Sequence, residues 1–306
     1  MENFTAMPYK KLGNSTLQVS RIGFGCMSLQ YNQPGLQNII DLAIEKGINY
    51  FDTADIYENG LNETALGNAL KEKRKQVIIA TKVGNQQKQD GSGLSWNPSK
   101  THIINVVEKS LSRLQTDYID LYQLHGGTIE DNIDETIEAF ESLQQQGKIR
   151  YYGISSIRPN VIRAYAERSN IVSVMLQYSL LDRRAEESIL PLLQQNNIGC
   201  LARGSLAGGL LAGKALKPYL NYRQNQVAAA ANAIKISTTG NSNLAATAIG
   251  FSLSNMAVTA AVVGIRTIEQ LTDSIMAIST EEEKQFPSKI DYLKAIIPVN
   301  NYDQHQ

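Results

Sequence analysis

Residues 49–57 read Asn-Tyr-Phe-Asp-Thr-Ala-Asp-Ile-Tyr, an apolar strand that ends in the carboxylate of Asp52 and is followed, one loop later, by the phenol of Tyr57. In isolation, such residues more often cap a turn and pack over a loop. Here two later apolar strands end in the partners that such a pair would need, Lys82 and His125. Burying four such groups together is costly unless they satisfy one another. The fold that joins these strand ends therefore decides the interpretation.

A unit of helix, Gly or basic break, β-branched strand and polar loop recurs along the chain. Eight alternating units predict an α/β fold, a closed parallel (β/α)8 TIM barrel, rather than two open sheets. No linker composition divides the chain, so we expect one barrel domain over residues 1–306, with a hairpin at 9–20 ahead of the repeat. The predicted strands are 22–25, 50–52, 77–82, 119–125, 150–155, 172–177, 199–203 and 260–264, and the predicted helices include 36–46, 62–71, 99–114, 134–146 and 268–277.

Residues 215–244 interrupt this rhythm, because they are rich in Ala, Asn, Gln, Ser and Thr and show weak periodicity. We expect a long loop plus a helix between strands seven and eight. Whether this segment closes over a bound cofactor stays open.

The composition points to a small-molecule partner. The 306 residues carry 29 basic and 29 acidic side chains, so we expect no nucleic acid or membrane partner. Cys26 and Cys200 are far apart and lack CxxC or metal-ligand spacing, so we expect neither a disulfide nor a metal site. The first residues do not form a basic, apolar leader, and no apolar run of about 18 residues follows. These features predict a cytoplasmic protein.

The chemistry that suits the four strand-end residues is proton transfer to a carbonyl oxygen. A tyrosine has a reference pKa of about 10, and a nearby ammonium lowers it by stabilising the phenolate. Lys82 can supply the ammonium, Asp52 can keep it charged, and His125 can orient the carbonyl or share the proton relay. None of the four is a nucleophile beside a base, which disfavours hydrolysis. The remaining reaction is a reduction, whose hydride a cofactor supplies.

The loops after strands seven and eight are where barrels tend to bind phosphate. The Rossmann fingerprint is absent, since residues 23–25 give only a G-x-G. Residues 203–214 form a glycine-rich stretch whose N–H groups could hold a pyrophosphate, and Arg266 and Thr267 open a helix. The alternative, in which the glycines only shape turns and Arg266 is solvated, stays open. The side chains that could hydrogen-bond a carboxamide end strands five and six, namely Ser155, Ser156 and Gln177.

The strand ends carry five motifs in a fixed order, namely Phe51-Asp-Thr-Ala-Asp-Ile-Tyr57, Ile79-Ala-Thr-Lys82, Asp117-Tyr-Ile-Asp-Leu-Tyr-Gln-Leu-His125, Tyr152-Gly-Ile-Ser-Ser156 and Gln177-Tyr-Ser-Leu180. With them the chain resembles the aldo-keto reductase family over nearly its whole length, and most of all a bacterial branch with Ala202-Arg203-Gly204 after strand seven. The resemblance implies a monomeric (β/α)8 barrel with a basal hairpin, which reduces aldehydes or ketones with NADPH rather than NADH. It implies that Tyr57 is the acid, tuned by Lys82 and Asp52, and that His125 orients the substrate.

The resemblance also implies which residues hold the cofactor. The serines after strand five and Gln177 would hold the nicotinamide amide, the glycine-rich loop from Ser205 the pyrophosphate, and the start of the last barrel helix the adenosine 2′-phosphate region. The full set is Gly25, Cys26, Met27, Asp52, Ser155, Ser156, Gln177, Arg203, Gly204, Ser205, Leu206, Ala207, Gly208, Arg266, Thr267, Gln270, Asp273 and Ser274.

Three of these positions, and Val263 beside them, depart from the family pattern. Ser156 stands where many members have Asn, Val263 replaces a common Pro, and Ser274 replaces a common Asn that touches adenine. Arg203 replaces the aromatic residue that usually stacks on the nicotinamide. A guanidinium can also stack, but its charge repels the cationic oxidised ring. We therefore expect Arg203 to favour the reduced cofactor.

Met27 and Trp96 are expected to join Tyr57 and His125 as walls of the substrate site. Trp96 ends the loop 91–96, and we expect it to form an apolar lid over a small aldehyde. An alternative from another functional class keeps the barrel and the cofactor but senses nucleotide on behalf of a partner protein, as the potassium-channel β subunits of the family do. Turnover, as opposed to binding alone, discriminates the two.

Overall fold

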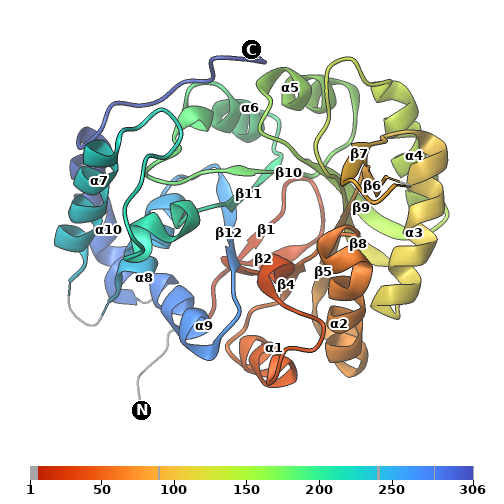
Figure 1. Cartoon of the computed structure of the whole chain (residues 1–306), viewed down its shortest axis with the longest axis horizontal. Coiled ribbons are helices and arrows are strands. Elements are labelled where there is room, and N and C mark those ends of the chain that lie inside the picture. The colour runs from red at the N-terminus through yellow and green to blue at the C-terminus, as the bar shows by residue number, and fades with distance from the viewer. Residues whose placement is uncertain (1–5, 89, 240–241, 279, 306) are drawn as a thin grey trace.

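Eight strands form a closed parallel barrel in the computed structural model, which describes residues 6–88, 90–239, 242–278 and 280–305 (Figure 1). Around the barrel the order is β3, β4, β5, β8, β9, β10, β11, β12. The predicted barrel and all eight predicted strands are confirmed, with strand ends that differ by at most two residues. The strands are β3 (Ile22–Gly25), β4 (Tyr50–Asp52), β5 (Ile78–Val83), β8 (Ile119–Leu124), β9 (Ile149–Ser155), β10 (Ser173–Gln177), β11 (Gly199–Arg203) and β12 (Val258–Gly264).

Helices surround the barrel and bury their apolar faces against it (Figure 1). Side-chain oxygens start several of them; Ser99 Oγ, for example, accepts from the His102 N–H in the first turn of α3. None of the described helices is long and apolar enough to cross a membrane. The helices are α1 (Leu36–Glu45), α2 (Leu61–Leu70), α3 (Lys100–Leu114), α4 (Ile133–Gln145), α5 (Pro159–Arg168), α6 (Ile189–Gln195), α7 (Gln224–Ser237), α8 (Leu244–Leu253), α9 (Ile268–Ile275) and α10 (Thr280–Ala295).

The segment 215–244 contains the predicted loop and helix. The loop runs to Arg223, α7 follows, and α8 begins at Leu244, while residues 240 and 241 lie outside the described part of the chain. The face that α7 buries includes the small residues Ala230 and Ala233. Alanines contribute little to an apolar pattern, which explains the weak periodicity of this segment.

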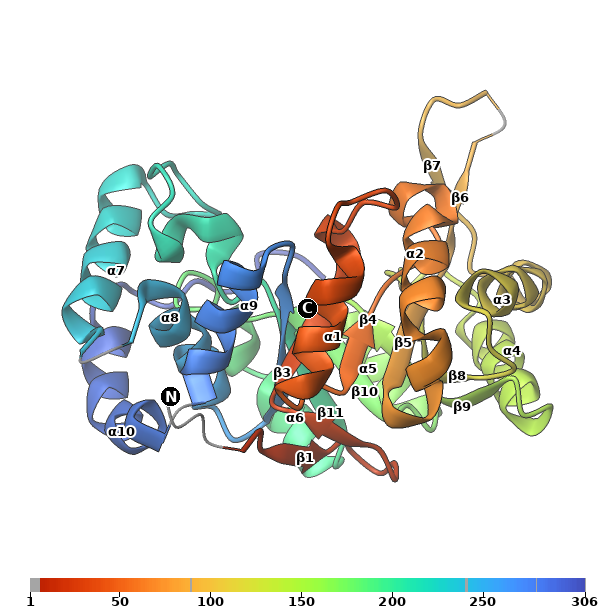
Figure 2. The ribbon, with the colours of Figure 1, turned by 90° about the horizontal axis from the view of Figure 1, so that it is seen from below.

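Two hairpins lie at opposite ends of the barrel (Figure 2). The first, β1 (Tyr9–Lys11) with β2 (Gln18–Ser20), is the predicted N-terminal hairpin, and Leu12 and Val19 bury their side chains in the core inside the barrel. At Gly13, whose φ is +53°, a Cβ would lie 2.3 Å from the Val172 carbonyl oxygen, so the turn needs a glycine to pack this closely. The second hairpin, β6 (Asn85–Gln87) with β7 (Leu94–Trp96), stands beside the opposite mouth.

Alternation along the strands separates an inner core from an outer one. Tyr50, Ile78, Ala80, Leu121 and Leu201 belong to the cluster inside the barrel, while the residues between them pack toward the helices. Because the side-chain period is two, the next inward positions toward the carboxyl ends carry polar groups instead. These positions are Asp52, Lys82, Gln123 and Arg203, and they form the floor of the mouth.

Candidate active site

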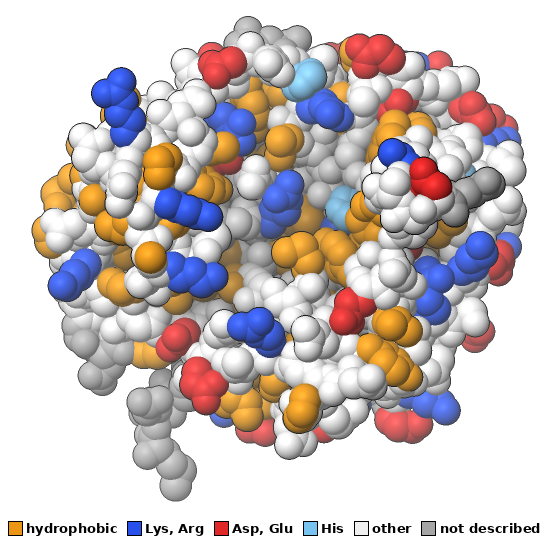
Figure 3. All heavy atoms as spheres, in the orientation of Figure 1, with side chains coloured by type: hydrophobic (Ala, Val, Ile, Leu, Met, Phe, Trp, Pro, Cys, Tyr) orange, Lys and Arg blue, Asp and Glu red, His pale blue; other side chains and the backbone are white. Residues whose placement is uncertain are grey.

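A cavity of about 1270 Å³ opens at the carboxyl ends of the strands (Figure 3). All four predicted catalytic residues, Asp52, Tyr57, Lys82 and His125, line it. They come from β4, the loop after β4, β5, and the residue that follows β8. The barrel thus brings together residues that lie up to 73 positions apart in the sequence (125 − 52).

The centre of this group is a buried ion pair. The side chain of Lys82 is 1% exposed and its Nζ contacts Asp52 Oδ1. Lys82 Nζ also donates to the Thr53 carbonyl oxygen at 2.7 Å, and Gln123 Nε2 donates to the second oxygen of Asp52 at 3.2 Å. Burial alone would lower the pKa of Lys82, but Asp52 and Tyr57 raise it above its ordinary value. The lysine is therefore held as an ammonium.

Tyr57 presents its hydroxyl 3.5 Å from Lys82 Nζ. Burial raises the pKa of Tyr57, and the Lys82 charge opposes that effect only in part. This corrects the expectation that the ammonium would bring the pKa of the phenol below its usual value. In the chain by itself the tyrosine is thus a protonated phenol, with a cation in place to stabilise its phenolate.

His125 lies edge-on to Tyr57, with the ring centroids 6.0 Å apart and an angle of 83° between the planes. Its backbone N–H donates to the Val83 carbonyl at 2.7 Å, which fixes the residue at the end of β8. Burial, together with the charges of Lys82 and Arg203, lowers the pKa of His125 to about 3. The imidazole is neutral at pH 7, and its Nδ1 is buried without a partner among the described residues. This favours an orienting hydrogen bond over a proton relay.

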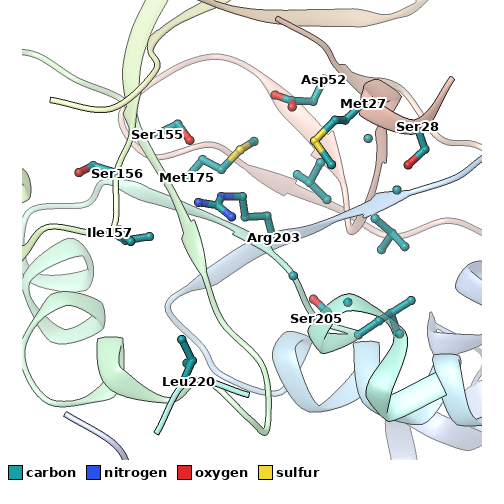
Figure 4. A pocket seen from close by; sticks show the side chains of 18 of the residues that line it. Met27, Ser28, Asp52, Ser155, Ser156, Ile157, Met175, Arg203, Ser205 and Leu220 are labelled. Atoms are coloured by element: carbon teal, nitrogen blue, oxygen red, sulfur yellow. The ribbon is translucent and has the colours of Figure 1, made fainter. Parts of the chain in front are cut away.

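Most of the residues predicted to hold a cofactor line the same cavity (Figure 4). In Figure 4, Arg203 projects toward Met175 and toward Ser155 and Ser156 at the end of β9. The predicted residues that line the cavity are Gly25, Met27, Asp52, Ser155, Ser156, Arg203, Gly204, Ser205, Leu206, Gly208, Arg266, Gln270, Asp273 and Ser274.

Four predicted cofactor residues do not line the cavity. Cys26 and Ala207 are fully buried in the outer core. Thr267 caps α9, where its hydroxyl accepts from the Gln270 N–H at 3.2 Å. Gln177 packs behind Gly204, where its Cγ lies 3.8 Å from the place that a Cβ on that glycine would occupy. A role of these four in holding a cofactor therefore stays a prediction.

The loop after β11 has the form that an anionic group requires. Gly204 and Gly208 have φ values of +75° and +68°, and a Cβ at Gly208 would meet nothing within 4 Å. Ser205 Oγ is buried and lacks a partner within the described part of the chain. Lys214 and Arg266 line the same side of the cavity. Open backbone, a free hydroxyl and two cations fit the phosphate groups of a dinucleotide.

Trp96, the predicted lid, does not line the cavity in the chain alone. It belongs to β7, and its indole Nε1 donates to Asp131 at 2.9 and 3.0 Å. Its ring packs against Gly84 and Gly126, behind the wall of the cavity. The hydrogen bond to Asp131, which a loop prediction does not reveal, fixes the ring in this place.

Sequence reasoning missed three parts of the site. Gln123 and Met175 point into the barrel, and counting alternate residues back from His125 and Gln177 would have found both. The C-terminal residues 300–305 also line the cavity. They are held there by contacts such as the Asn160 N–H donating to the His305 carbonyl at 2.8 Å. No local sequence pattern predicts these long-range contacts.

Comparison with known proteins agrees with this geometry. The chain matches the model of the Aldo/keto reductase family over residues 21–295, so it belongs to this family and is an oxidoreductase of that class. The uncharacterized oxidoreductase YqkF of Bacillus subtilis is 48% identical over 94% of this chain and 99% of its own length. The aldo-keto reductase AKR11C1 of Bacillus halodurans, in its holo form, has a TM-score of 0.88 and 47% identity, over 98% of this chain and 99% of its own. An aldo-keto reductase of Schizosaccharomyces pombe, yakc, whose name specifies NADP(+), is 32% identical over 70% of this chain and 65% of its own length.

Proposed function

We propose that the protein reduces aldehydes or ketones to alcohols, with NADPH as the reductant and Tyr57 as the general acid. The observation that carries the proposal is the buried ammonium of Lys82, which contacts Asp52 on one side and lies 3.5 Å from the Tyr57 hydroxyl on the other. A cation in this place stabilises the charge that a tyrosine acquires only after it has given up its proton. The arrangement is thus suited to the transition state rather than to the resting phenol.

The four catalytic residues divide the work of proton transfer. Burial keeps Tyr57 protonated, so the acid is available at neutral pH. As its proton moves to the carbonyl oxygen, the phenolate forms beside the Lys82 ammonium in a site of low dielectric. His125, neutral at this pH, donates a ring N–H to the same oxygen and orients it. A bound nicotinamide cofactor supplies the hydride in this chemistry.

The residues that would hold the cofactor are divided between two sides of the mouth. Ser155 and Ser156 offer hydroxyls to the carboxamide, the loop from Gly204 to Gly208 offers backbone N–H groups to the pyrophosphate, and Arg266 offers a charge to the 2′-phosphate. The NADP(+) in the name of the Schizosaccharomyces pombe relative supports this choice of cofactor. Met27, 66% exposed at the rim, is the proposed wall for the substrate.

Absorbance at 340 nm tests the proposal directly. We expect the wild-type protein to consume NADPH in the presence of a panel of aromatic and aliphatic aldehydes, to consume NADH more slowly, and to consume neither without an aldehyde. Tight NADPH binding with no turnover of any carbonyl would contradict the reductase and favour a nucleotide sensor. Failure to bind either nucleotide would refute the cofactor assignment itself.

A further inference from the structure

The cavity carries more positive charge than its own acidic groups balance (Figure 3). Its acidic lining residues are Asp52, Asp273 and Asp303. Its lysines and arginines are Lys82, Arg158, Arg184, Arg203, Lys214 and Arg266. Lys82 pairs with Asp52, and Arg184 pairs with Asp182. The other four cations form no ion pair with any residue that the structure describes, so they are available to a ligand.

The order of strands in the barrel separates these four cations. Lys214 and Arg266 follow β11 and β12, on the side that would hold the phosphates of a cofactor. Arg203 ends β11 and projects into the middle of the mouth (Figure 4). Arg158 follows β9, which pairs with β8, the strand that His125 follows. Arg158 is therefore the one of the four that follows the strand next to β8, which leads to His125.

Two hydrogen bonds fix Arg158 in the wall of the cavity, close to the residues that follow His125. Its Nη1 donates to the Gly127 carbonyl, two residues past His125, and its backbone N–H donates to Ser156 Oγ at 3.2 Å. A guanidinium has five N–H donors, and the Gly127 bond uses one of them. The C-terminal tail closes the same end of the cavity, where the Asn160 N–H holds the His305 carbonyl. Asp303, the acid of this tail, already accepts from Asn221 Nδ2 at 3.2 Å.

We propose that Arg158 binds a carboxylate of the substrate, an inference that rests on the proposed function. The preferred substrates are then aldehydes or ketones that also carry a carboxylic acid. A planar guanidinium with free donors matches a carboxylate in a bidentate manner. With the carboxylate on Arg158, the carbonyl extends toward Tyr57 and His125 along the same wall. Arg158 is then a specificity-determining residue, and the tail 300–305 limits the length of the molecule between the two groups.

A matched pair of aldehydes of similar size tests this inference, namely 4-carboxybenzaldehyde and its neutral methyl ester. The readout is the ratio of kcat/KM for the acid to kcat/KM for the ester, at saturating NADPH. We expect Arg158→Gln to lower this ratio at least 10-fold and Arg158→Lys to retain part of it. Arg163→Gln, one turn further along α5 and outside the cavity lining, should leave the ratio unchanged.

A purely structural role for Arg158, such as holding the Gly127 loop, would lower kcat/KM for both aldehydes equally and leave their ratio unchanged, which would overturn the inference.

Ionic strength gives a second test on the wild type alone. Between about 20 and about 300 mM NaCl, kcat/KM should fall for the acid and not for the ester, because salt screens the attraction. Equal salt dependence would also overturn the inference. If the ester is turned over and the acid is not preferred, this inference alone is contradicted. If neither aldehyde is turned over, the proposed function is contradicted as well.

Discussion

The two sides of the barrel mouth differ in whether their polar and charged side chains find partners within the chain. On the side of β4, β5 and β8, the Lys82 ammonium has Asp52 and a backbone carbonyl as partners, and Asp52 also accepts from Gln123. On the side of β11 and β12, Ser205 Oγ is buried without a described partner, and Arg266 forms no described ion pair. The first side holds the proposed acid with its charged partners already in place. The second side would be completed by the phosphates of the proposed cofactor.

This difference has a physical cause. A buried lysine requires a counter-ion from the chain itself, since leaving one charge unpaired in the interior costs several kcal/mol. Cations at the rim can remain hydrated until a ligand arrives, so they need no internal partner. Substitutions on the first side should therefore affect folding as well as turnover, and substitutions on the second side should affect ligand affinity alone.

The largest effect is expected from Lys82→Met. Removing the ammonium leaves the Asp52 carboxylate buried and unpaired, so the free energy of unfolding should fall by about 3–5 kcal/mol, and turnover should be lost. Urea denaturation measures the first effect. The double variant Asp52→Asn with Lys82→Met removes both charges and should recover much of the stability. If the free energy of unfolding fell equally in the single and the double variant, an unpaired buried charge would not be the cause of the loss.

The pH dependence of stability tests the burial of His125. Its pKa is depressed to about 3 in the folded chain, while an unfolded histidine titrates near 6.5, so the unfolded state takes up a proton first as the pH falls. Stability should therefore be lost progressively below about pH 6.5, by about 2 kcal/mol at pH 5 from this residue. His125→Asn should lack that loss, and the exposed His305→Asn should keep it. Urea midpoints at pH 7 and pH 5 that shift equally in the wild type and His125→Asn would contradict the assignment.

A more selective effect is expected from Arg266→Gln on the opposite side. If the guanidinium binds the 2′-phosphate, its removal should raise KM for NADPH about 10-fold or more, because a charged hydrogen bond contributes about 1.5–3 kcal/mol. KM for NADH should barely change, because NADH lacks that phosphate. Folding stability should be unaffected. A parallel rise for both nucleotides would place the 2′-phosphate elsewhere.

The smallest effect concerns Arg203, which lies between the two sides. Its charge should disfavour the cationic oxidised ring by about 1 kcal/mol in a solvated mouth, or roughly 5-fold in affinity. Arg203→Tyr should reduce the ratio of the dissociation constants of NADP+ and NADPH by that factor. Calorimetric titration with each nucleotide gives the ratio. An unchanged ratio would refute the idea that Arg203 favours the reduced form.

The barrel itself was predictable because its strands are short, mostly apolar and separated by clear helices. The four proposed catalytic residues could be predicted as well, since Asp52, Lys82 and His125 each lie at or next to the end of an apolar strand, and parallel strands bring such ends together. Alternation along a strand, had it been counted, would also have revealed Gln123 beneath them.

Residues whose direction depends on distant partners could not be predicted. Trp96 donates to Asp131, which lies 35 positions away in the sequence, and it does not line the cavity. The tail 300–305 is held at the cavity by contacts with distant segments, among them Asn160 of α5 and Asn221 before α7. The direction of the pKa shift of Tyr57 could not be predicted either. Burial and the lysine charge act in opposite directions, and only the structure shows which of them prevails.

The most direct test of the central claim is to measure NADPH affinity and turnover side by side in the wild type and Tyr57→Phe. Tyr118→Phe, at the other end of the barrel between Arg74 and Arg150, serves as the matched control. If the two sides of the mouth are independent, Tyr57→Phe should lower kcat by about 100-fold or more, as expected for a lost general acid, and leave the dissociation constant of NADPH within about 2-fold. Retained turnover in Tyr57→Phe, or a loss of NADPH affinity as large as the loss of kcat, would contradict the account.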